Sequence, residues 1–154
     1  MTGHRSIGGS RYSEAGEGEA VLFLGGDAPT VVDAFKEQFR AISLDVESGD
    51  PISQVRRLLD DLGISSANIV GFGSGAEVAL RFAAEFPHRA RRIALIDAAP
   101  EHEDATSILC PTLILMSEVN HSGAEALVRR LQRGRAAHGA QMAESTCALR
   151  HATR

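Results

Sequence analysis

Residues Ile69–Ala76 read Ile-Val-Gly-Phe-Gly-Ser-Gly-Ala, and this stretch decides the fold. Its apolar start is typical of a buried strand, and its three glycines predict a tight turn. A run with helical spacing, Ser74–Phe86, follows at once and ends before Pro87. A strand that enters a helix through a glycine turn is the unit from which parallel α/β sheets are built.

The rest of the chain repeats this alternation of strand and helix. Short apolar runs predict further strands, and amphipathic runs predict the helices between them. Since strands and helices alternate, we predict an α/β fold with a doubly wound, mostly parallel sheet. The further predicted strands are Tyr12–Gly18, Ala20–Leu24, Ala41–Val46, Ile93–Ile96, Thr112–Met116 and, more weakly, Gln141–Glu144; the further predicted helices are Asp27–Phe39, Pro51–Leu62 and Gly123–Leu131.

Composition predicts one domain over residues 1–154, in which 1–19 form an N-terminal strand and turn region and 121–154 a C-terminal helix and tail. A net charge of -4 gives no overall attraction to nucleic acid. No apolar run reaches the roughly 18 residues needed to span a bilayer, and no signal peptide is evident. We therefore expect a cytoplasmic protein without nucleic-acid or membrane partners, in which Cys110 and Cys147 are reduced.

The glycine turn resembles the nucleophile elbow of the α/β-hydrolase family, a Gly-x-Ser-x-Gly turn between strand and helix. Gly71 and Gly75 match its outer glycines. Other segments resemble the family in the family's order, so the resemblance covers most of Tyr12–Asn120 and implies its sheet. These segments are Tyr12–Gly18, Val21–Gly26, Leu59–Ile64, Phe86–Asp97 and Cys110–Leu115.

Gly73 stands where the resemblance places the family's serine. Acyl transfer in this family needs that hydroxyl, a histidine base, an orienting acid and amides aimed at an oxyanion. The amide of Ser74 and one from Gly25 or Gly26 would supply the oxyanion hole. The resemblance therefore implies a small-molecule pocket of oxyanion type whose catalytic triad is degenerate.

Four residues are predicted to form the rest of the site. Asp97 ends a strand, where it could serve as the acid or cap the following turn, and Asn120 lies near the family's usual acid position. His151 falls near the spacing of the family's histidine or belongs to a frayed terminus. Ser74 could cap the helix or act as a displaced nucleophile. We interpret Glu101–Asp104 as a solvated loop, and expect no metal and no cofactor.

Only Ala98–Cys110 fill the interval where the family usually carries a cap, so we expect no cap domain. Apolar surface left around the pocket would then favour a homodimer. Three functions stay open: an enzyme that works by other means (an esterase using Ser74, or a cofactor-free lyase, isomerase or cyclase), a non-catalytic protein that binds a ligand or partner protein, and a dinucleotide-binding protein. The last rests on Gly71, Gly73 and Ala76 with Asp97, which match a dinucleotide fingerprint.

Overall fold

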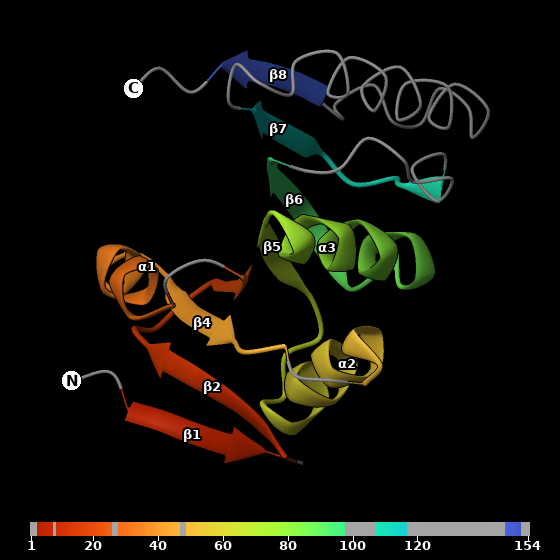
Figure 1. Cartoon of the computed structure of the whole chain (residues 1–154). Helices are drawn as coiled ribbons and strands as arrows, with labels where there is room; N and C mark the ends of the chain where they lie inside the picture. The colour runs from red at the N-terminus through yellow and green to blue at the C-terminus, as the bar shows by residue number, and fades with distance from the viewer. Residues whose placement is uncertain are drawn as a thin grey trace.

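A computed structural model describes residues 3–7, 9–25, 28–46, 49–97, 107–116 and 147–151. Its described strands form an eight-stranded sheet in the order β1-β2-β4-β3-β5-β6-β7-β8, with helices on both faces (Figure 1). The strands are β1 (Gly3–Ile7), β2 (Ser10–Ala15), β3 (Ala20–Leu24), β4 (Arg40–Leu44), β5 (Ala67–Phe72), β6 (Ala90–Ile96), β7 (Thr112–Met116) and β8 (Cys147–His151). The helices are α1 (Ala28–Phe35), α2 (Pro51–Asp61) and α3 (Ser74–Glu85).

The sheet is parallel from β4 to β8, and antiparallel where β2 pairs with β1 and with β4. This confirms the predicted α/β class and the doubly wound, mostly parallel sheet. All five residues of β3 are buried, as expected for a central strand covered on both faces. Parallel strands end at the same edge, so the turns after β3, β4, β5 and β6 gather there.

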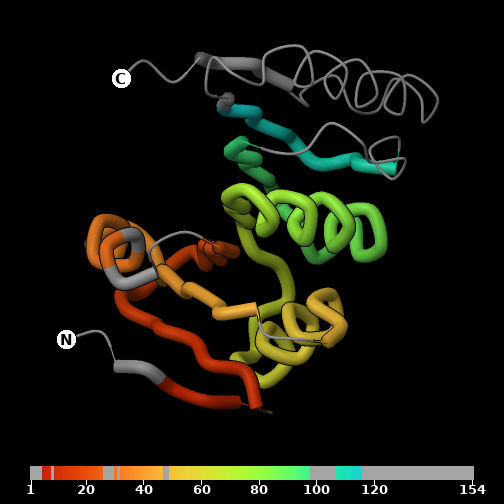
Figure 2. The backbone as a smooth tube through the Cα atoms, in the orientation of Figure 1, coloured from red at the N-terminus to blue at the C-terminus, as the bar shows by residue number. Residues whose placement is uncertain are grey.

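Alternation along β3 divides the core into two layers. Leu22 and Leu24 belong to the larger layer, which the buried faces of α2 and α3 complete. Val21 and Phe23 point the other way and pack with Val32 of α1. Figure 2 shows α1 on one side of the strands and α2 and α3 on the other. Residues of β5 and α3, on either side of the turn between them, are thus packed into the larger layer of the core.

Several boundaries differ from those predicted. Strand β1 was not expected, although the Gly8-Gly9 pair before β2 is a recognised hairpin signal, and Gly9 has a φ of 90°. Helix α1 ends at Phe35, so Phe39 lies in the turn that follows it. The last described strand is β8 rather than Gln141–Glu144. That segment and Gly123–Leu131 lie outside the described residues.

Candidate functional site

The turn between β5 and α3 is held in a conformation that glycine adopts without strain. Gly73 is the N-cap of α3, with φ 55° and ψ -117°. Its N–H donates to the carbonyl of Ile96 at 2.9 Å, which ties the turn to β6. A residue with a side chain would pay a conformational cost at this positive φ.

The three glycines of the turn have different surroundings. A Cβ atom on Gly71 would lie 2.5 Å from the Cα atom of Ala76, and one on Gly75 would collide with the carbonyl of Leu24. A Cβ atom on Gly73 would meet nothing within 4 Å. Packing of α3 against the sheet therefore requires glycine at the two outer positions, whereas the middle position has room for a side chain.

Register across the sheet places Gly73, Asp97 and His151 in one row at the edge where the parallel strands end. Gly73 and Asp97 follow the paired residues that close β5 and β6, and the N–H of Asp97 donates to the carbonyl of Leu115 at 2.9 Å. Neighbouring strands lie about 4.8 Å apart, so Asp97 is one strand from Gly73 and His151 three. The pairs that fix this row are Phe72 with Ile96, Ile96 with Leu115, and Met116 with His151.

Asp97 combines exposure with an uncommon backbone conformation. Its φ of 52° is the only positive value among the described residues other than glycine. Aspartate tolerates this region better than most residues, and such conformations concentrate at functional sites. Asp97 therefore lies where a site residue is expected, next to Gly73.

The other predicted site residues have mixed outcomes. Ser74 is the first residue of α3, and no side-chain hydrogen bond caps this helix, so the predicted capping role of Ser74 is wrong. His151 is the last residue of β8 instead of following the final strand. Gly26, Asn120 and the Glu101–Asp104 loop lie outside the described residues.

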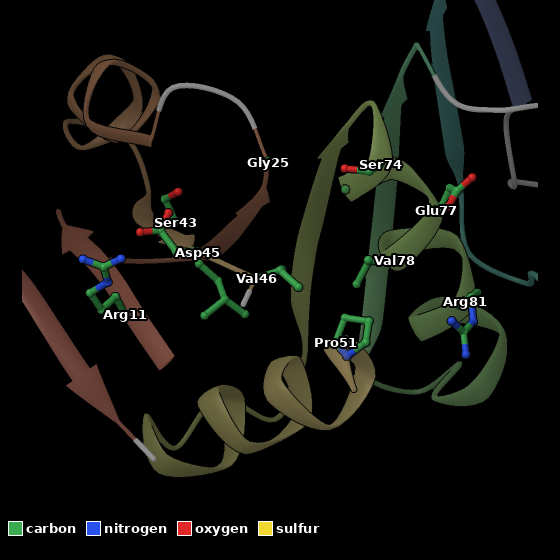
Figure 3. A pocket seen from close by; sticks show the side chains of 12 residues that line it. Arg11, Gly25, Ser43, Asp45, Val46, Pro51, Ser74, Glu77, Val78 and Arg81 are labelled. Carbon is green, nitrogen blue, oxygen red and sulfur yellow. The ribbon is translucent and has the colours of Figure 1, made fainter. Parts of the chain in front are cut away.

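A cavity of about 640 Å³ opens beside the start of α3 (Figure 3). It extends from Ser74 across the ends of β3 and β4 to α2, and it takes in Gly25, one of the predicted oxyanion donors. Two arginines and two acidic residues line it, so its formal charge is balanced. The lining residues are Arg11, Gly25, Ser43, Leu44, Asp45, Val46, Pro51, Ser74, Gly75, Glu77, Val78 and Arg81.

Sequence reasoning missed the polar residues Arg11, Ser43, Asp45 and Arg81 of this cavity. Two signals could have found some of them. Ser43 and Asp45 lie at the carboxyl end of a parallel strand, where ligands bind in such sheets. Arg81 follows Ser74 by seven residues and so shares its helix face.

A second cavity of about 310 Å³ lies on the α1 face of the sheet. Its walls include Phe23, Phe35 and Phe39, and Phe35 is 42% exposed. Asn68 also lines it, and the Oδ1 atom of Asn68 is buried without a hydrogen-bond partner. This apolar surface is separate from the surface around the first cavity on which the expected homodimer rests, and the homodimer stays a prediction.

In the described part of the chain, no group of three or more histidine, cysteine or acidic side chains is arranged to hold a metal ion. None of the helices described there has the length and apolar character required to cross a bilayer.

Comparison with known proteins agrees with this geometry. The family model for the alpha/beta hydrolase fold matches residues 35–148. The chain belongs to the α/β-hydrolase family. The matched range includes β5, the glycine turn and α3.

Individual relatives are more distant. A 2-hydroxy-6-oxo-6-phenylhexa-2,4-dienoate hydrolase from Comamonas testosteroni is 31% identical over 110 residues, which cover 55% of this chain and 38% of that protein. The match therefore spans about two fifths of the curated relative. An α/β-hydrolase enzyme from the metagenome of lagoon sediments at Mar Chica, Morocco, superposes with a TM-score of 0.74 at 15% identity, covering 97% of this chain and 87% of that one. A meta-cleavage product hydrolase from Pseudomonas fluorescens IP01 gives 0.72 at 15% identity, covering 92% and 84%.

Proposed function

We propose that this α/β-hydrolase binds a small acyl compound at the start of α3 and does not form an acyl-enzyme through the family's serine position. The observation that carries the proposal is Gly73. Its φ of 55° and ψ of -117° belong to a sharp strand-to-helix turn, and open space surrounds the point where a side chain would begin. Gly73 thus lies in a sharp strand-to-helix turn but provides no hydroxyl at the position of the family's serine.

Binding of an acyl oxygen is supported by the free end of α3. The first N–H groups of a helix have no acceptor four residues earlier within the helix. In α3 the N–H of Ala76 donates to the carbonyl of Gly73, and no side chain caps the first turn. Partial positive charge at a helix N-terminus favours an oxygen that carries negative charge. Gly25 lines the same cavity as Ser74 and Gly75, so its amide is the proposed second donor.

Loss of the usual reaction follows from the positions of the remaining groups. A serine hydroxyl needs a base within about 3 Å to become a nucleophile. Asp97 is the row neighbour of Gly73, but a carboxylate alone does not replace the serine nucleophile in this acyl transfer. His151 lies three strands away along the backbone. We propose binding, or a reaction without a covalent intermediate, in which Asp97 and His151 act on the bound compound.

Labelling by a serine-directed phosphonate, read by mass spectrometry of the intact protein, tests the proposal. The wild-type chain should stay unlabelled and should not turn over short nitrophenyl esters. Gly73→Ser should gain a label only slowly, because the open space accepts the hydroxyl beside the oxyanion donors but His151 lies three strands away as a base. Gly73→Ala is the matched control, with the same backbone cost and no hydroxyl. Labelling of the wild-type chain would contradict the proposal.

An esterase that uses Ser74 is the second candidate, favoured by one observation. Ser74 is exposed, lines the cavity and is not engaged in capping. This candidate predicts labelling of the wild-type chain at Ser74 and its loss in Ser74→Ala. Turnover that survives in Ser74→Ala would dispose of Ser74 as the nucleophile.

A further inference from the structure

We propose that the cavity takes an elongated organic acid, with its carbonyl or acyl group at the start of α3 and a carboxylate at Arg81. This inference rests on the proposed function and adds the chemical class of the ligand. It comes from the spacing of polar and apolar groups along the cavity (Figure 3).

The wall formed by α3 has a polar group at each end and an apolar centre. Ser74, Val78 and Arg81 all line the cavity, and their spacing of four and then three residues places them on one face of the helix. At 1.5 Å per residue, the backbone positions of Ser74 and Arg81 lie about 10 Å apart along the helix axis. Val46 and Pro51 face Val78 from the opposite wall (Figure 3). A ligand with two polar ends and an apolar middle fits this arrangement.

Arg81 is suited to hold the distant carboxylate. It is exposed at the cavity wall, and within the described residues it forms no ion pair. Its charge acts on Asp50 only as a minor contribution. A guanidinium binds a carboxylate through two parallel hydrogen bonds, which gives the end of the ligand a fixed orientation.

The acidic lining residues restrict where a second anion can lie. Glu77 lies one turn before Arg81 on α3, and Asp45 lines the cavity at the end of β4. Both disfavour a carboxylate near the middle of the cavity, since like charges repel. The start of α3 and the guanidinium of Arg81 therefore remain as the places for negative charge.

Ser43 adds a polar group to the opposite side of the cavity. It is only 2% exposed, yet it lines the cavity at the end of β4. Its hydroxyl is therefore placed to bind a polar group on the ligand across the cavity from Ser74.

Isothermal titration of the full chain with α,ω-dicarboxylates of increasing length tests this class, with the monocarboxylates of equal length as controls. One carboxylate of the probe takes the place of the acyl oxygen at the start of α3, and the other takes the place of the carboxylate at Arg81. Affinity should be greatest where the two groups are about 10 Å apart. Arg81→Gln should weaken the best dicarboxylate about tenfold or more and leave the monocarboxylate unchanged.

Two control variants distinguish the loss of the Arg81 contact from a change in folding or in overall charge. Arg81→Lys keeps the charge and should retain binding within a few fold. Arg56→Gln removes a charge from α2 outside the cavity and should have no effect. Equal affinity for both probe series, or unchanged affinity in Arg81→Gln, overturns the inference. Phosphonate labelling of Gly73→Ser tests the proposed function in a separate experiment. The proposed function can therefore stand when the proposed ligand class is wrong, and the ligand class can stand when the proposed function is wrong.

Discussion

Helices α2 and α3 both begin at the wall of the same cavity, but their first turns are built differently. Asp50 caps α2: its carboxylate accepts from the N–H of Ile52 at 3.2 Å, and Pro51 occupies the first turn. Helix α3 begins at Gly73, and no side chain caps it. Helix α2 thus binds one of its first amides with its own side chain, whereas in α3 the N–H of Ala76 donates to the carbonyl of Gly73 and no side chain caps the first turn.

The start of α2 therefore stabilises its own helix, whereas the start of α3 is the part of the cavity that we propose binds a ligand. A capped N-terminus stabilises its own helix and offers little to a ligand. An uncapped N-terminus on a strand-to-helix turn can bind an anion, which is the role proposed above for the start of α3. Five substitutions test this contrast between the two helix starts.

Gly75→Ala should have the largest effect on stability. Its Cβ atom would collide with the carbonyl of Leu24, so α3 must move away from β3. We expect a loss of at least about 3 kcal/mol in the free energy of unfolding, the upper range for overpacked cores. Urea unfolding followed by circular dichroism measures it. A loss below about 1 kcal/mol would mean that the turn does not require glycine there.

Gly73→Ala should cost less, because its cost is conformational. The side chain has room, but φ is 55°. Such backbone conformations cost about 1–3 kcal/mol in residues other than glycine. The same urea experiment compares the two variants directly. Equal losses for Gly73→Ala and Gly75→Ala would contradict the distinction between the middle and outer glycines.

Asp50 makes the start of α2 sensitive to acid. The hydrogen bond from the Ser53 side chain, followed by those from the Ile52 and Ser53 amides, lowers the pKa of Asp50 below 3.8, while desolvation opposes this. Because the folded-state pKa is depressed, the charge of Asp50 stabilises the fold at neutral pH. That contribution is lost as the pH falls through the lowered pKa.

Asp50→Asn keeps an acceptor for capping and removes the titration. Its melting temperature should lie a few degrees below that of the wild-type chain at neutral pH, and the gap should close between pH 3.8 and more acidic values. Asp50→Ala should show a larger gap that persists in acid. A gap in Asp50→Asn that does not depend on pH would show that the charge contributes nothing.

Much of the fold could be predicted because its signals are local. The glycine turn and the apolar runs of β3, β5 and β7 are contiguous in sequence, and their order carried the resemblance to the family that the match over residues 35–148 shows. Strand β8 was misplaced because a short edge strand is defined by its partner β7 more than by its own pattern.

The cavity was less predictable because its walls meet only in three dimensions. Arg11 and Arg81 are 70 positions apart in sequence and line one cavity because β4 lies between β2 and β3. The capping role predicted for Ser74 failed for a related reason. It depended on where the helix begins, and the positive φ that glycine permits makes Gly73 the N-cap.

Ser74→Ala should have the smallest effect on stability and gives the sharpest contrast with Asp50→Ala. Ser74 is exposed, and α3 has no side-chain capping bond to lose. We expect a change within about 0.5 kcal/mol in the free energy of unfolding, as for surface positions without special contacts. Urea unfolding beside Asp50→Ala under the same conditions measures it. A loss in Ser74→Ala as large as in Asp50→Ala would mean that its hydroxyl caps α3 in solution, and the terminal amides would then not be free for a ligand.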